Sequence, residues 1–94
     1  MSPRVLWVDG AGEARLISIE EDAITFLSAV PWPPGSRVQG TAFGASTEVS
    51  LRVKIHSSKR NPDGEFLLRG RPLDLTRDAR SALEAMLDLD LGRA

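Results

Sequence analysis

The chain has 94 residues, which is enough for one domain, and we expect a single unit over residues 1–94. Hydrophobic residues make up 41% of the chain and charged residues 27%, which is typical of a soluble globular domain and excludes a disordered one. The chain contains no cysteine, so disulfides and thiolate metal sites are excluded, and its formal net charge of -1 gives no overall attraction to nucleic acid or anionic lipid.

Six short strands and one helix are expected in chain order, because β-branched and aromatic runs alternate with turns that contain glycine and proline. Gly10 and Gly12 fit the turn between the first two strands. Gly40 interrupts the fourth strand, where an interior glycine is typical of a bulge or a barrel corner. The expected strands cover residues 4–9, 13–19, 23–27, 36–43, 47–57 and 65–71, and the helix covers residues 77–90.

The second and third of these strands flank an acidic turn at residues 20–22. Ile17 and Ile19 precede the turn, and Ile24 and Phe26 follow it. Such side chains favour a pleated, half-buried surface, and the backbone of a polar turn can reach water. We therefore expect a hairpin here, with the rest of the chain organised around it.

The clearest periodicity lies in residues 47–57. Val49, Leu51, Val53 and Ile55 alternate with polar residues, which is the period of two that a strand produces. One face of this strand is therefore expected to be buried and the other to face water.

A helix is expected after the sixth strand. Thr76 is its expected N-cap, Asp78 favours the helix dipole in the first turn, and Gly92 can end the helix. Apolar residues recur at helical spacing at Ala79, Ala82, Leu83, Met86 and Leu87. The elements together predict a mainly β fold, either a small antiparallel barrel or a strongly bent sheet, capped by this helix.

The order of three segments, ARLISIEEDAITFL, PPGSRV and VSLRVKIHSSKRNPDGEFLLRGRPLDLTRDARSALEAML, resembles the PilZ domain. The resemblance covers nearly the whole chain and implies a six-stranded antiparallel β-barrel with one C-terminal helix. It also implies a bacterial cytoplasmic protein that works in motility, type IV pili or signalling complexes. A cytoplasmic location is expected from the residues as well, since no apolar run resembles a signal peptide or a membrane span.

PilZ domains usually bind cyclic di-GMP through an Arg-x-x-x-Arg segment and an Asp/Asn-x-Ser-x-x-Gly motif. Only three residues precede Arg4, so we expect no arginine segment of this kind. Ser18, Glu20 and Ala23 stand where the second motif has Asp or Asn, Ser and Gly. The carboxylates of residues 20–22 would repel the ligand's phosphates. We therefore expect a degenerate PilZ-like domain without the dinucleotide site; a receptor with an atypical site is the alternative.

No set of residues predicts catalysis. His56, the single histidine, is expected on the wet face of its strand without a partner for acid–base chemistry. The acidic residues 20–22 are adjacent on a short turn and are not expected to converge on a cation. Residues 10–12 (GAG) lead into a strand rather than a helix, so they form no phosphate loop. We expect no enzyme, no metal and no cofactor.

A further alternative is a small barrel that binds nucleic acid through charge and stacking. Arg52, Lys54, Lys59 and Arg60 could form a basic patch. However, the chain has no tyrosine and its three phenylalanines are expected inside, so this face is expected to protect the sheet from edge pairing instead.

The sequence predicts that the functional site is a surface that binds another protein. Trp32 lies in a proline-rich loop, where it could anchor a partner or fold back to close the barrel, whereas Trp7 is expected to pack inside. The helix carries a second apolar row that a partner, or a second copy in a homodimer, could cover. The expected interface residues are Trp32, Pro33, Pro34, Met86 and Leu89.

Overall fold

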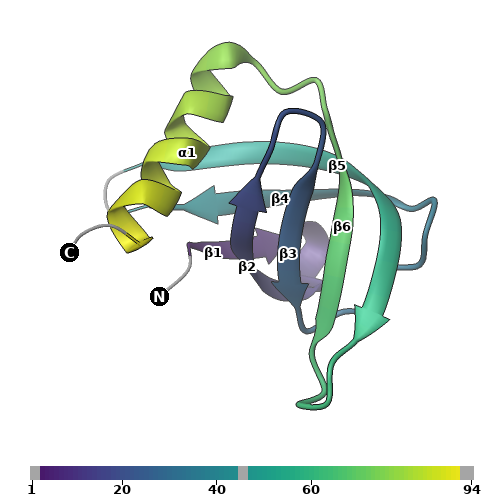
Figure 1. Cartoon of the computed structure of the whole chain (residues 1–94). Coiled ribbons are helices and arrows are strands. Elements are labelled where there is room, and N and C mark those ends of the chain that lie inside the picture. Colours follow the sequence, from purple (N-terminus) through teal and green to yellow (C-terminus); the bar gives the residue numbers. More distant parts are fainter. Residues whose placement is uncertain (1–2, 45–46, 92–94) are drawn as a thin grey trace.

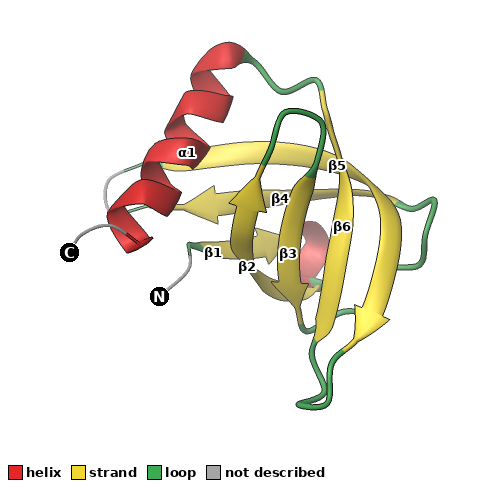
Figure 2. Cartoon of the chain, in the orientation of Figure 1, coloured by secondary structure: helices red, strands yellow, loops and turns green. Residues whose placement is uncertain are grey.

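The computed structural model describes residues 3–44 and 47–91 of the chain. Six strands form a closed antiparallel barrel in the order β1-β2-β3-β6-β5-β4, and the helix α1 packs on it (Figure 1 and Figure 2). The expected barrel with one C-terminal helix is therefore confirmed. The elements are β1 (Arg4–Trp7), η1 (Val8–Gly10), β2 (Gly12–Ile19), β3 (Ile24–Ser28), β4 (Arg37–Phe43), β5 (Glu48–Arg60), β6 (Phe66–Leu73) and α1 (Arg77–Leu91).

Three strand ends differ by two or three residues from the sequence expectation. β6 ends at Leu73 instead of residue 71, because Pro72 and Leu73 still pair with β5. β1 ends at Trp7 instead of residue 9, because the chain turns through η1, a short 3₁₀ helix whose Val8 carbonyl accepts a hydrogen bond from the Ala11 amide at 3.2 Å. β5 extends to Arg60 instead of residue 57, because its last residues pair with the start of β6, with Arg60 opposite Phe66.

β5 connects the two halves of the barrel. Its first half pairs with β4 and its second half with β6, and residues 52–54 pair with both. The side chains alternate as predicted, and Val49, Leu51, Val53 and Ile55 are all buried. A register shift between Ile55 and Ser57 bends the strand, as a bulge does.

Glycine is required inside two strands because other chain segments approach closely. A Cβ atom on Gly40 would lie 2.8 Å from Cε3 of Trp7. A Cβ atom on Gly70 would meet the carbonyl oxygen of Lys54 and would lie 2.7 Å from Cγ1 of Val53. No register shift occurs at Gly40, so this glycine allows the Trp7 ring to pack and is no bulge. Gly70, in contrast, lies opposite Ile55, where the register shift of β5 begins.

The core fills the barrel with side chains from all six strands and α1. Trp7 is buried, as predicted, and its ring meets the ring of Phe26 edge-on at a centroid distance of 5.1 Å. Its indole nitrogen donates a hydrogen bond to the hydroxyl of Ser28 at 3.2 Å. One of the few buried polar groups is thereby satisfied.

α1 covers one end of the barrel and contacts β2 and β5 (Figure 1). The amide of Ala79 donates a hydrogen bond to the side-chain oxygen of Thr76 at 3.1 Å, which confirms the predicted N-cap. Leu83 and Leu87 are buried against the barrel. The predicted stop at Gly92 lies outside the described residues. In the described part of the chain, no helix has the length and apolar character that a membrane crossing needs.

Candidate functional site

The turn between β2 and β3 is held by two arginines from other elements. Glu20 forms an ion pair with Arg69 of β6 at 2.9 Å. Arg80 of α1 donates hydrogen bonds to the backbone carbonyls of Glu20 and Glu21, at 2.9 and 2.7 Å. The turn at residues 20–22 is therefore tied to β6 and α1 by contacts within the chain.

The acidic side chains of this turn lie at the surface. Glu20, Glu21 and Asp22 are exposed, and Glu20 points to an arginine. Among the side chains that the structure describes, no group of three or more histidine or acidic residues is placed to hold a metal ion. His56 is exposed on the outer face of β5, as predicted from its place on the solvent-facing side of the strand.

Trp32 is half-buried and closes the barrel beside Trp7. The two rings are perpendicular, with a centroid distance of 6.2 Å, and Trp32 packs against the core. Its indole nitrogen is buried and has no hydrogen-bond partner among the described residues. Pro33 and Pro34 of the same loop are exposed. Trp32 is therefore partly a core residue, and only the remainder of its ring can meet a ligand.

Met86 is not part of an exposed apolar row. Its side chain is 6% exposed, and it lies against Gly44, where a Cβ atom would be 3.0 Å from Cγ of Met86. Gly44 follows the last residue of β4, whereas Trp32 lies near Arg37 at the first, so the two sites are about 20 Å apart. Met86 was expected on an apolar row that a partner could cover, but it is buried, and it lies far from Trp32. The side chain of Leu89 lies outside the described residues.

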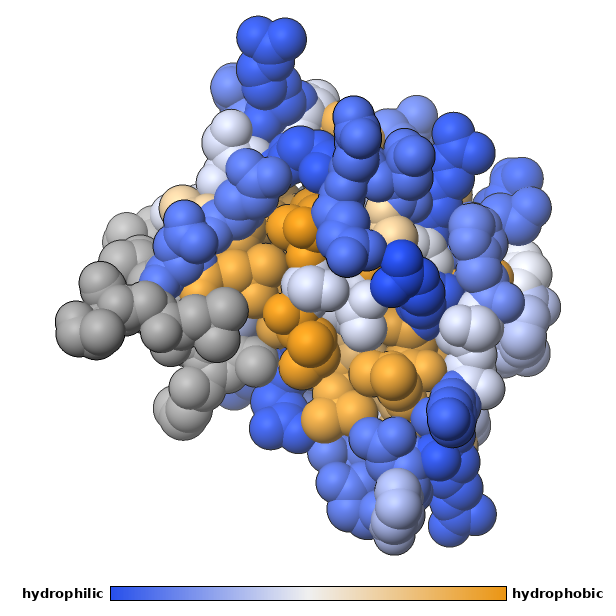
Figure 3. Space-filling view, in the orientation of Figure 1, coloured by the Kyte–Doolittle hydropathy of each residue, from blue (hydrophilic) through white to orange (hydrophobic). Residues whose placement is uncertain are grey.

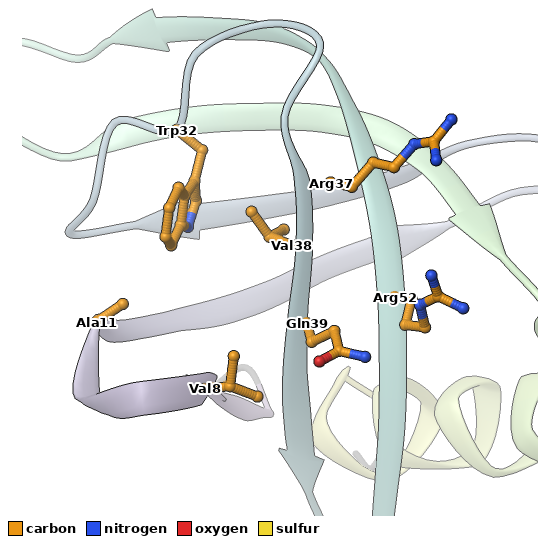
Figure 4. A pocket seen from close by; sticks show the side chains of 7 residues that line it. All are labelled: Val8, Ala11, Trp32, Arg37, Val38, Gln39 and Arg52. Carbon is orange, nitrogen blue, oxygen red and sulfur yellow. The ribbon is translucent and has the colours of Figure 1, made fainter.

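A hollow of about 410 Å³ lies between Trp32 and the start of β4; we call it the Trp32 hollow. It lies where β1 has ended: the last pair of β1 with β4 is Trp7 with Gly40, so residues 37–39 have no strand partner on that side. In Figure 4 the side chains of Arg37 and Arg52 lie on the other side of β4 from Trp32 and Val38, and their guanidinium groups extend away from the Trp32 ring. The lining residues are Val8, Ala11, Trp32, Arg37, Val38, Gln39 and Arg52.

Three large apolar side chains face outward from β2, β3 and β6. Ile17 and Leu67 are each 37% exposed and Leu27 is half-buried; we call these three the apolar strip. Leu27 lies opposite Leu67 in the sheet, and Ile17 faces outward because it follows the buried Leu16 in the alternation of β2. Figure 3 shows apolar surface over this face of the barrel, bordered by polar residues.

A second hollow, of about 380 Å³, adjoins the apolar strip at Leu27. Ala14 and Ala29 contribute further apolar lining. At its rim, Arg15 and Glu65 form an ion pair at 2.9 Å. The face thus combines an apolar centre with a charged rim, which is the usual arrangement of a protein interface.

Sequence reasoning missed the apolar strip. The signal is present in the chain, because Leu27 and Leu67 interrupt positions that alternation assigns to water. Recognising it requires knowing that β3 pairs with β6, a contact between segments about 40 residues apart.

In comparisons with known proteins, no family model, curated protein or solved structure matches the chain.

Proposed function

We propose that this protein is a non-enzymatic, PilZ-like adaptor of the bacterial cytoplasm that acts in motility or related signalling. It works by binding another protein and does not use cyclic di-GMP. The apolar strip is the observation that carries this proposal. Ile17, Leu27 and Leu67 place apolar surface in water on a barrel that does not need it for its own core. Apolar patches with polar rims are typical of interaction sites.

Two observations support the PilZ-like part of the proposal. The closed barrel with a C-terminal helix agrees with the architecture that the resemblance implies. The turn at residues 20–22 favours independence from cyclic di-GMP, because Glu21 and Asp22 expose carboxylates there and Arg80 is already bound to backbone carbonyls. A ligand with two phosphates would meet like charge and would find this guanidinium occupied.

Calorimetric titration with cyclic di-GMP tests the independence from this ligand. We expect no binding heat at ligand concentrations up to tens of micromolar. Binding at micromolar affinity or tighter would contradict the proposal and support a receptor with an atypical site.

The interface is tested with Leu67→Glu, which places a charge in the centre of the apolar strip. Ser50→Glu, an exposed position on β5, is the matched control. We expect Leu67→Glu to keep the melting temperature but to lose the partner that the parent and Ser50→Glu capture from extract of the source bacterium. Sedimentation of the purified protein determines whether the partner is a second copy. Equal capture by both variants would contradict this interface.

A further inference from the structure

Three cationic side chains lie next to one another on the outer face of β4, β5 and β6. The strand register places Arg37 opposite Lys54, and Lys54 opposite Arg71. All three side chains are exposed. Because neighbouring strands are about 4.8 Å apart, this cationic row spans about 10 Å.

Arg37 and Lys54 lack the compensation that other arginines of the barrel have, whereas Arg71 lines a hollow together with Glu21, Asp22 and Asp74. Arg15, Arg52 and Arg69 each form an ion pair at 2.9 Å. Among the residues whose side chains the structure describes, Arg37, Lys54 and Arg71 form none. Like charges directly opposite each other destabilise a sheet, so the fold carries an unfavourable interaction that a bound anion would relieve. This concentration of charge occurs in a chain whose formal net charge is -1.

The Trp32 hollow adjoins one end of the cationic row, since Arg37 belongs to both. Its volume of about 410 Å³ lies within the range of pockets that hold small organic groups. Trp32 supplies an aromatic wall and Gln39 an amide that can both donate and accept hydrogen bonds. A further hollow of about 240 Å³ shares Gln39 and Arg52 and continues the groove along the same face.

We propose that this face binds single-stranded nucleic acid, with a base in the Trp32 hollow and phosphates along the cationic row. A basic groove beside an aromatic wall is the arrangement by which proteins bind single strands without sequence preference. The cationic row offers more cations than a single phosphate needs, and a further hollow adjoins the Trp32 hollow. A chain of nucleotides therefore fits this face better than a single nucleotide does. This site is separate from the apolar strip and does not depend on the adaptor proposal.

The first test measures the fluorescence anisotropy of a labelled ten-nucleotide DNA single strand at several salt concentrations. Three phosphate contacts predict that the logarithm of the binding constant falls with the logarithm of salt with a slope of about -2. Lys54→Gln should weaken binding several-fold and reduce the size of the slope by about 0.7. Arg15→Gln removes one guanidinium from the opposite side of the barrel and should leave both values unchanged.

Absence of binding at a low ionic strength of about 50 mM salt would overturn the proposal. An equal loss in Lys54→Gln and Arg15→Gln would also overturn it, because binding would then follow net charge alone.

The second test concerns the position of the base. Saturation with the oligonucleotide should quench tryptophan fluorescence through Trp32, because Trp7 is only 3% exposed. Trp32→Leu keeps an apolar group at the barrel end and should weaken binding by about tenfold, since it removes the stacking surface. Unchanged fluorescence in the parent protein would contradict this placement, whether or not the variant folds.

Competition distinguishes the ligand classes. Adenosine monophosphate should displace the labelled oligonucleotide only at far higher concentration than an unlabelled single strand does. Polyglutamate of equal charge should also compete weakly, because it has no aromatic base. Competition by the mononucleotide as strong as by the single strand would assign the site to free nucleotides, and equal competition by polyglutamate would assign it to an acidic polypeptide. Either result would overturn the proposal.

Discussion

The indole nitrogen of Trp7 donates a hydrogen bond to the hydroxyl of Ser28 inside the barrel, across 21 residues of chain. The same hydroxyl accepts a hydrogen bond from the amide of Val30 and donates one to its carbonyl, each at 2.9 Å. Ser28 is fully buried and therefore satisfies three polar groups at the point where β3 leaves the sheet. It also fixes the start of the loop that carries Trp32.

Ser28→Ala should destabilise the protein by about 1–3 kcal/mol, because it leaves the Trp7 indole N–H without a partner inside the barrel. Urea unfolding followed by circular dichroism measures the change. Ser50→Ala, at an exposed site on β5, should change the stability by less than about 0.5 kcal/mol. If Ser28→Ala is as stable as Ser50→Ala, the buried hydrogen bonds of Ser28 contribute nothing to the free energy of unfolding.

Val53→Asp should unfold the domain, because Val53 is fully buried and an unpaired carboxylate there is strongly unfavourable. Lys54→Asp, at the neighbouring exposed position, should fold normally. Its stability should be unchanged or slightly higher, since a carboxylate would then lie between Arg37 and Arg71. Thermal melts of both variants test this, and similar melting would show that the register of β5 is wrong.

Arg80→Ala removes the two hydrogen bonds between α1 and the β2–β3 turn. We expect a loss of about 1 kcal/mol, because the bonds are charge-assisted but solvent-exposed. Hydrogen exchange should accelerate in α1 and in the turn at residues 20–22. Arg77→Ala, in the first turn of the same helix, should have little effect. Equal exchange rates in the two variants would show that Arg80 does not hold the helix.

Trp32→Ala should lower the free energy of unfolding by about 2 kcal/mol, which is less than for a fully buried tryptophan because the ring is half-buried. The loss comes from the contact with the Trp7 ring and the core. Pro33→Ala, at an exposed neighbour, is the control for the loop. An unchanged melting temperature together with lost partner capture would instead identify Trp32 as an interface anchor.

The residues that the sequence placed correctly are those whose environment depends on local pattern. The alternation of Val49, Leu51, Val53 and Ile55 requires only the period of a strand, and Thr76 requires only the chemistry of a helix start. Both were predicted without knowledge of any neighbour.

The errors concern residues whose environment depends on distant segments. Helical spacing showed that Met86 is on an apolar face, but only the packing against Gly44 shows that the barrel covers it. The cationic row was only partly anticipated, because Arg37 and Arg71 join Lys54 through strand pairing. A site assembled from several strands requires the register, which residue patterns do not supply.

Barrel closure also has a kinetic consequence. It requires β1 to meet β4, with Arg4 opposite Phe43, and β3 to meet β6, with Ile24 opposite Gly70. Such non-local pairings must overcome loop-closure entropy before they contribute stability, so we expect refolding in milliseconds to seconds, not microseconds. Until both form, the nascent sheet keeps unpaired edges that can join other chains. Aggregation should therefore compete with folding during refolding from denaturant and become negligible once the ring of strands is complete.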